Sequence, residues 1–276
     1  MVIVSFGVMK SASSYQYQIL SEILHARHQS FDDYLAHRKL LVGKKYASLY
    51  YDPNQQELIE ILSLVPKTDF FAYKTHDFMK GSHSEAEFSL PISISNKINR
   101  NEIKIIGSIR DPREIILSAI DHCNRTKADE TNDFFSTLDN YDSTIPHIKH
   151  AFKKALAWEK TKKILWIPYD SLFEYEVEII AAIQDVMCLH FIDIFDRIEK
   201  LKSKGIFHQY NKGVRQRWKT ELTEQEQDKF GEVFKSEIDF YTKIYSKMNE
   251  HFRKYTKYVI KKKDEAVIEK KYYNIK

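Results

Sequence analysis

Four short, mainly apolar runs separated by stretches of helical periodicity constrain the fold of this chain more than any other feature. Each run has the length of a buried strand, and between the runs the apolar positions recur at helical spacing. Strands that alternate with helices predict an α/β fold, in which a central, mostly parallel β-sheet is flanked by helices on both faces. The four predicted strands are Val2–Val8, Asp69–Lys74, Glu102–Ile109 and Ile164–Pro168.

Capping residues mark several of the predicted helices. Asp111 can cap one helix, and Pro112 then occupies its first helical position. Thr223 and Glu226 have the spacing of a capping box. Further helices are predicted over Asn54–Leu64, Ile145–Lys160 and Ser171–Met187.

The composition is that of a globular protein with a sizeable core. Of the 276 residues, 43% are apolar and 13% aromatic, which excludes disorder over the whole chain. No internal repeat and no Gly/Ser linker interrupts the pattern, so we predict a single domain over residues 1–251. No apolar run approaches the ~18 residues of a membrane helix, and the first run lacks the basic start of a secretory signal. The two cysteines, Cys123 and Cys188, are compatible with a reducing cytoplasm.

The positive charge is concentrated at the C-terminus. Residues 252–276 hold nine Lys and Arg against three Asp and Glu, whereas the whole chain carries a net charge of +4. Residues 1–251 are therefore slightly acidic, while a nucleic-acid-binding protein would show a basic excess over its folded body. We predict no nucleic-acid partner and interpret residues 252–276 as a solvated basic helix or tail.

The turn between the first strand and the next helix has the composition of an anion site. It is P-loop-like, because several backbone N–H groups and a helix N-terminus converge there and favour negative charge. Lys10 adds a cation, and Ser11, Ser13 and Ser14 add hydroxyl donors. The spacing of a nucleoside-triphosphatase loop is absent. A Ser-rich cap, with Ser13 or Ser14 capping the helix beside a solvated Lys10, explains the segment equally well.

Two other predicted strands also end in polar residues. Arg110 follows the third strand, and Ser118 comes eight residues later in the next helix. Lys74 and His76 come at the end of the second strand. Open α/β folds bind ligands at this carboxyl edge of the sheet. Taken one at a time, Arg110 is better explained as a surface residue paired with an acidic neighbour, and His76 as a structural histidine.

Taken in order, these segments resemble the sulfotransferases that use 3′-phosphoadenosine 5′-phosphosulfate (PAPS). Lys10–Tyr15 is similar to their 5′-phosphosulfate loop, commonly Lys-Ser-Gly-Thr-Thr-Trp, and the Arg110/Ser118 pair to their 3′-phosphate motif. Lys74–His76 matches the Lys-Thr-His of the cytosolic, small-molecule branch. Two further segments also resemble family motifs: Ile167–Leu172, and Asn211–Gly213 followed by Trp218–Lys219.

The chain departs from the family pattern at three positions. Ala12 stands where Gly is usual, so its backbone must be one that Ala allows or the loop must be remodelled. Tyr15 replaces a Trp that would stack on adenine and offers a smaller face. Asn211 replaces an Arg that would contact the 3′-phosphate, which predicts weaker donor affinity.

The resemblance implies in-line transfer of a sulfuryl group from PAPS, with the desulfonated nucleotide PAP as product and no metal. It assigns the acceptor proton to His76, the leaving oxygen to Lys10 and the transferring sulfuryl oxygens to Lys74. Ser118 is implied in both the 3′-phosphate site and the control of Lys10. The implied donor site comprises Lys10, Ser11, Ala12, Ser13, Ser14, Tyr15, Arg110, Ser118, Tyr169, Asn211, Lys212 and Gly213.

The acceptor is predicted only by class. His76 favours a cytoplasmic enzyme that sulfates a hydroxyl or amine of a small-molecule metabolite, without a membrane partner; a homodimer is left open. Two alternatives remain: a carbohydrate sulfotransferase, and a non-catalytic binder of phosphoadenosine compounds or sulfated glycans. A kinase would need a Gly-rich loop and a Mg²⁺-holding Asp, and neither is evident. Residues 28–52 and 78–101 are candidates for an acceptor wall that suits a polar or cationic metabolite, although ordinary surface and core explain them slightly better. The named residues are Tyr46, Tyr50, Tyr51, Phe78, His83, Phe88, Asp32, Asp33, Glu85 and Glu87.

Overall fold

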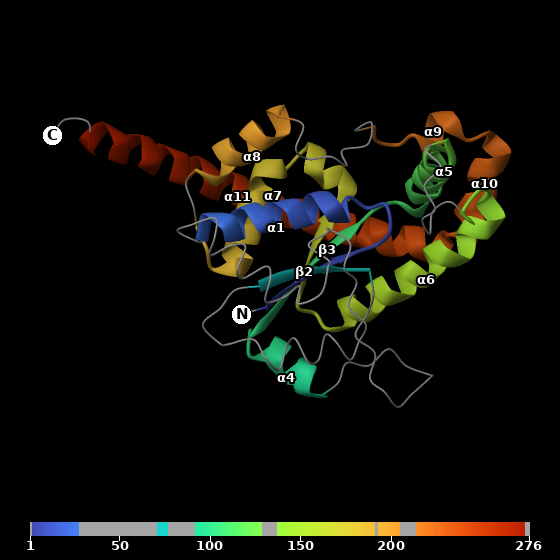
Figure 1. The fold of residues 1–276 in the computed structure, drawn as a ribbon, viewed down its shortest axis with the longest axis horizontal. Helices are drawn as coiled ribbons and strands as arrows, with labels where there is room; N and C mark the ends of the chain where they lie inside the picture. Colours follow the sequence, from blue (N-terminus) through green and yellow to red (C-terminus); the bar gives the residue numbers. More distant parts are fainter. Residues whose placement is uncertain are drawn as a thin grey trace.

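Four parallel strands form the centre of the molecule. The computed structural model describes residues 2–27, 71–76, 92–128, 137–190, 193–204 and 214–273. Their sheet has the order β2-β1-β3-β4, and every neighbouring pair is parallel. The predicted α/β fold with a parallel sheet is therefore confirmed (Figure 1). The strands are β1 (Val2–Gly7), β2 (Phe71–Thr75), β3 (Ile103–Ile109) and β4 (Ile164–Pro168).

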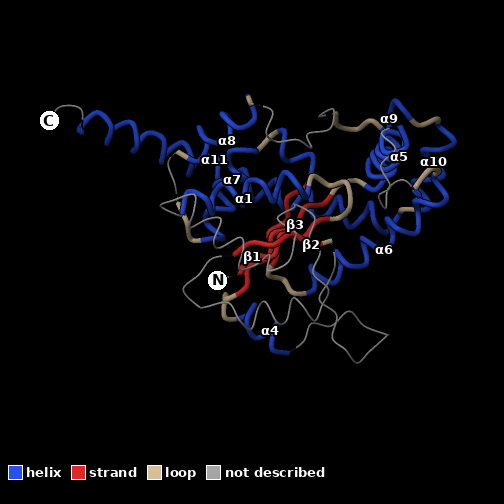
Figure 2. Tube along the Cα trace, in the orientation of Figure 1, coloured by secondary structure: helices blue, strands red, loops and turns tan. Residues whose placement is uncertain are grey.

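Helices cover both faces of this sheet, as Figure 2 shows. Successive residues of a strand point to opposite faces. On β1, Ser5 accepts a hydrogen bond of 2.9 Å from Gln16 of α1 (Ser13–Arg27), whereas the ring of Phe6 lies 6.1 Å from that of Trp158 on α6 (Tyr141–Lys160). The helices α1 and α6 therefore lie on opposite faces. The other helices are α4 (Ile92–Asn99), α5 (Pro112–Ala128), α7 (Glu176–Met187), α8 (Ile194–Ser203), α9 (Trp218–Glu221), α10 (Glu224–Val233) and α11 (Lys235–Tyr273).

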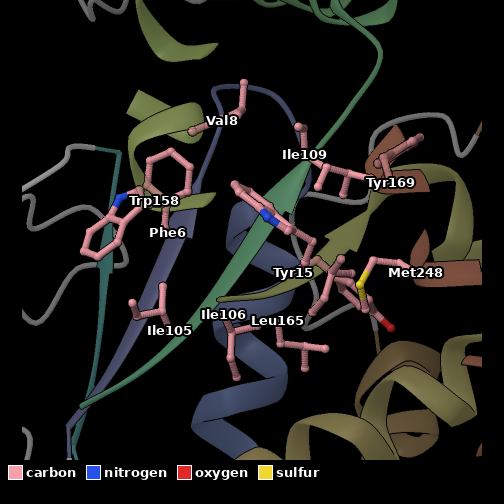
Figure 3. Packing of buried hydrophobic residues seen from close by; sticks show 14 of the residues in the cluster. Phe6, Val8, Tyr15, Ile105, Ile106, Ile109, Trp158, Leu165, Tyr169 and Met248 are labelled. Carbon is pink, nitrogen blue, oxygen red and sulfur yellow. The ribbon is translucent and has the colours of Figure 1, made fainter. Parts of the chain in front are cut away.

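The core is built on strands that are buried on both faces. All residues of β1 are buried, which explains why its sequence is continuously apolar rather than alternating. Phe6 and Trp158 pack together on one face of the sheet (Figure 3). A β-carbon at Gly107 would approach the ring of Trp166 to 2.7 Å, so glycine at this position leaves room for that ring to lie over β3.

The predicted strand bounds agree with β4 at both ends and with the other three strands to within two residues, whereas two predicted helices differ from the structure. The capping box at Thr223 and Glu226 is present. Helix α6 begins four residues before the predicted Ile145, because Asn140 caps it and the helix tolerates Pro146 in its interior. The predicted helix over Ser171–Met187 is divided into a 3₁₀ turn, Tyr169–Phe173, and the separate helix α7. The predicted helix Asn54–Leu64 lies outside the described residues.

Helix α11 continues without a break across the predicted boundary between residues 251 and 252. Its first part packs on the body of the molecule, where Phe252 is fully buried, and its last part projects beyond the other helices (Figure 1). The sequence predicts a helix or a tail for this basic segment, and the structure has the helix, as far as Tyr273. Within the described ranges, no helix combines the length and the apolar character that crossing a membrane requires.

Candidate active site

The carboxyl ends of three strands bring the predicted site residues together. His76, after β2, lies with Nδ1 2.7 Å from the carbonyl oxygen of Gly7 at the end of β1. Lys74 donates from Nζ to Oγ of Ser14 at 2.8 Å. Arg110, after β3, lies with NH1 3.5 Å from the carbonyl oxygen of Lys10. The structure thus joins three motifs that are up to 100 residues apart in the sequence.

The loop after β1 makes a tight turn into α1. A β-carbon on Gly7 would lie 2.2 Å from that of Ser13, so the strand end and the helix can approach only because residue 7 is glycine. Oγ of Ser11 donates to the carbonyl oxygen of Val8 at 2.5 Å and bonds to Oγ of Ser108 at 2.8 Å. These bonds fix the turn, so its backbone is held in place ahead of the N-terminus of α1.

Two residues of this loop have a left-handed backbone. The φ angle is 59° at Lys10 and 67° at Ala12. A left-handed conformation costs a residue with a β-carbon about 1–2 kcal/mol relative to the right-handed one. The loop therefore keeps the conformation that suits glycine although Ala stands there. Because α1 begins at Ser13, Ala12 is at the N-cap position, and the expectation that Ser13 or Ser14 caps this helix was wrong.

The hydrogen bond of His76 determines its tautomer. A carbonyl oxygen can only accept, so Nδ1 carries the proton that is donated to Gly7. The lone pair of the neutral ring is then on Nε2. His76 is half-buried, and in this tautomer Nε2 is the ring nitrogen that can take up a proton.

Two lysines accompany the loop. Lys74 is only 6% exposed and is held by its bond to Ser14, whereas Lys10 is half-buried. Both reach this edge of the sheet from strand ends. Together with the N-terminus of α1 they make the edge electropositive, which favours an anionic ligand.

Arg110 is buried rather than at the surface, with 4% of the residue exposed. Its NH2 donates to Glu114 at 2.8 Å, and its guanidinium carbon lies 3.8 Å from the ring centre of Tyr169. The Nε of Arg110 has no hydrogen-bond partner among the described residues. Ser118 lies two turns into α5 and is also buried. Its predicted contact with a 3′-phosphate stays a prediction.

The sequence did not single out two carboxylates that organise the site. Glu114 accepts from Arg110, and its spacing of four residues from that arginine is a signal that could have found it. Glu176 accepts from the hydroxyl of Tyr15 and from Nζ of Lys202. Tyr15 is 3% exposed, so its ring belongs to the core in this structure, and its stacking on adenine stays a prediction.

Several predicted site residues lie outside the described residues. They are Asn211, Lys212 and Gly213 of the donor site, together with all the named residues of the acceptor wall. Trp218, from the same motif as Asn211, is described and half-buried, and it packs against the core. In the part of the chain that the structure describes, no group of three or more His, Cys, Asp or Glu has the arrangement of a metal site.

Solved structures with the same fold are sulfotransferases and a related enzyme. Mouse sulfotransferase SULT7A1 in complex with PAP aligns with a TM-score of 0.54 and 15% identity over 89% of this chain and 88% of that one. Retinol dehydratase in complex with retinol and PAP aligns with a TM-score of 0.52 and 15% identity over 85% and 80% of the two chains. No family model and no curated protein matches the sequence. The likeness shows that this chain has the sulfotransferase fold.

Proposed function

We propose that this chain, which has the fold of the sulfotransferases, transfers a sulfuryl group from PAPS to a small-molecule acceptor. One observation carries the proposal. The bond between Nδ1 of His76 and the carbonyl oxygen of Gly7 joins a histidine of defined tautomer, with the lone pair of its neutral ring on Nε2, to the end of an anion-binding loop. A binding module for phosphoadenosine compounds would need the loop but not the oriented imidazole.

The described residues fit the two anionic ends of such a donor. The loop amides, Ser13 and Ser14 suit the 5′-phosphosulfate, because a helix N-terminus and hydroxyl donors meet there. We assign Ser11 to the same site through its backbone, because its hydroxyl already donates to Val8. Arg110 suits the 3′-phosphate, since it is a buried cation whose Nε is unpaired among the described residues, and buried donors are normally satisfied. We assign Ser118, Lys212 and Gly213 to the same phosphate, and Ala12, Tyr15, Tyr169 and Asn211 to the donor site.

In the proposed reaction, an acceptor oxygen or nitrogen forms a bond to sulfur while the bond between sulfur and the bridging phosphate oxygen breaks. Nε2 of His76 receives the proton that the acceptor loses. The ammonium of Lys10 stabilises the charge that develops on the bridging oxygen, and Lys74 stabilises the sulfuryl oxygens. No other residue is required to move a proton, and PAP leaves with the bridging oxygen.

The acceptor class follows from the neighbours and from the histidine. The retinol dehydratase structure is a complex with PAP and with retinol, a small molecule. The Lys-Thr-His segment 74–76 supports the same branch for this chain. We therefore propose a hydroxyl or amine of a small metabolite as the acceptor. Cys123 and Cys188 are free thiols, which is compatible with the reducing cytoplasm that we propose as its compartment.

The donor site is tested first by ligand-dependent unfolding. PAP should raise the melting temperature of the protein and AMP should raise it much less, because only PAP carries the phosphate that Arg110 is proposed to bind. His76→Ala should then keep the PAP-dependent shift but lose the release of PAP from PAPS in the presence of small hydroxylated acceptors.

The exposed His190 provides the matched control, since His190→Ala should change neither measurement. Equal shifts with PAP and AMP would exclude the 3′-phosphate site. Full turnover in His76→Ala would remove this histidine from the mechanism.

A further inference from the structure

The first turn of α5 holds a buried carboxylate between two donors. The side chain of Glu114 is 2% exposed. Its Oε2 accepts from NH2 of Arg110 at 2.8 Å, and its Oε1 accepts from the main-chain N–H of Trp218 at 3.0 Å. Both carboxylate oxygens are therefore engaged, one by a side chain and one by the backbone of a distant segment.

The guanidinium of Arg110 is held from several sides and still has an unused donor. NH2 is fixed by Glu114, NH1 faces the carbonyl oxygen of Lys10 at 3.5 Å, and one face lies on the ring of Tyr169. Nε is buried without a partner among the described residues. An unsatisfied buried donor is unfavourable, so this atom is suited to an anion that the protein does not itself supply.

The same turn of α5 also holds the ring of Trp218. The guanidinium carbon of Arg113 lies 3.6 Å from the centre of that ring. Arg113 is fixed in turn by Asp111, with distances of 3.0 Å from Nε to Oδ1 and 2.6 Å from NH2 to Oδ2. Trp218 is thus held at two points: its main-chain N–H donates to Glu114, and its ring packs against Arg113.

We propose that Glu114 is a positioning residue for the 3′-phosphate site. One of its oxygens holds Arg110 and the other holds the main chain at Trp218, so the two are kept in one arrangement. The inference rests on the proposed function, since it concerns the phosphate that Arg110 is assigned to bind. It adds a residue that contacts neither donor nor acceptor and acts through Arg110. The sequence favours the short connection between Arg110 and Glu114, because Pro112, which lies between them, starts helix α5.

The electrostatics of Glu114 support this role. Burial raises the pKa of Glu114, while the N–H of Trp218 and the charge of Arg110 lower it. Burial has the larger effect, and the two donors that Glu114 holds oppose it because they favour the ionised form. As a charge alone, this carboxylate would repel a phosphate bound at Arg110. By holding Arg110 in place, Glu114 thus strengthens phosphate binding, whereas its negative charge weakens it.

Glu114→Asp separates the two effects, because it keeps the charge but shortens the side chain by one methylene. The shorter side chain cannot hold both donors at their present distances. We expect calorimetry on the full chain to show the dissociation constant for PAP rising about tenfold or more, as for the loss of a hydrogen bond to a charged group. The constant for AMP, which lacks the 3′-phosphate, should change less than about twofold.

A matched control is available in the last turn of α6. Glu159 also bridges two donors, Nε1 of Trp166 at 2.6 Å and Nζ of Lys247 at 3.5 Å, but it lies before β4 begins. Glu159→Asp should leave both dissociation constants unchanged. A purely structural loss in Glu114→Asp would instead weaken PAP and AMP equally, and that result would overturn the inference, as would unchanged PAP affinity.

Two further outcomes are decisive. If the unaltered protein does not bind PAP, both the proposed function and this inference fall; if it binds PAP and Glu114→Asp binds it equally well, only the inference falls. If Glu114→Asp does not fold, Glu114→Gln takes its place, because it keeps the length but replaces one acceptor by an N–H donor. The preference for PAP over AMP should then fall, and an unchanged or stronger preference would overturn the positioning role.

Discussion

At the scale of the residue, the site is built from groups whose partners limit what they can do. His76 has one tautomer because its Nδ1 faces a carbonyl oxygen. Glycine is the only residue type that fits at position 7, between β1 and α1. Ala12, in contrast, occupies a backbone conformation that favours glycine. The local strain at Ala12 is confined to the loop that we assign to the phosphosulfate.

Ala12→Gly should therefore stabilise the protein. At a φ of 67° the β-carbon of Ala12 is unfavourable, and removing it should raise the free energy of unfolding by about 1 kcal/mol, or the melting temperature by about 3 °C. Urea unfolding followed by circular dichroism measures the change. Ala151→Gly, within helix α6, is the control and should destabilise by about 1 kcal/mol. A less stable Ala12→Gly would show that the left-handed loop is not strained.

Asp170, which follows β4, gives a stability effect that depends on pH. Burial raises the pKa of Asp170, while the hydroxyl of Tyr241 and the charges of Arg110 and Arg215 lower it. Between the ordinary and the raised pKa, the folded protein holds a proton that the unfolded chain has lost. The free energy of unfolding must then fall as the pH rises through this range.

Asp170→Asn should remove this fall in the free energy of unfolding. Relative to the variant, the unaltered protein should lose stability as the pH rises above the ordinary pKa of an Asp, about 3.9, as urea titrations at each pH would measure. The exposed Asp139 is a control of opposite sign, because its bond to Lys127 lowers the pKa of Asp139. Relative to Asp139→Asn, the unaltered protein should instead gain stability as the pH rises to about 4, the ordinary pKa of an Asp, and should change little above it. Parallel pH profiles for Asp170→Asn and the unaltered protein would contradict the assignment to Asp170.

At the scale of the element, the buried strands could be predicted best. The predicted strand Ile164–Pro168 has the bounds of β4, and the prediction for β3 begins one residue early. These strands are recognisable because both of their faces are apolar and polar residues end them. The start of α6 was missed because Asn140 caps it well before the apolar pattern begins. The turn Tyr169–Phe173 was missed because its Tyr, Leu and Phe also fit a helical pattern.

The same difference applies to the site. That Lys10, His76 and Arg110 lie at one edge could be predicted, because parallel strands place their carboxyl ends together. The spacing of Glu114 indicates the partner of Arg110, but the more distant partners could not be predicted. Whether Tyr15 bonds to Glu176 depends on how α1 and α7 pack on the sheet. Sequence spacing limits such pairs to a set of neighbours, and only tertiary packing selects one of them.

At the scale of the whole molecule, α11 connects the body to the basic C-terminus. Its described contacts with the segment that leads into α7 and with α7 itself end at residue 256. The ring of Phe252 lies 6.3 Å from that of Tyr175, Tyr255 donates to Asp185 at 2.7 Å, and Thr256 donates to Glu178 at 2.9 Å. Beyond these residues the helix extends away from the sheet (Figure 1). The folded body therefore reaches past residue 251, which the sequence predicts as its end.

Two truncations test where the folded body ends. A chain ending at residue 256 keeps Phe252, Tyr255 and Thr256, so its melting temperature should stay within about 2 °C of that of the full chain. A chain ending at residue 251 loses Phe252, which is fully buried, and with it about 2 kcal/mol of apolar burial. Its melting temperature should fall by about 5 °C or more. Equal melting temperatures for the two truncated chains would place the end of the body at residue 251, because Phe252 would then contribute nothing to stability.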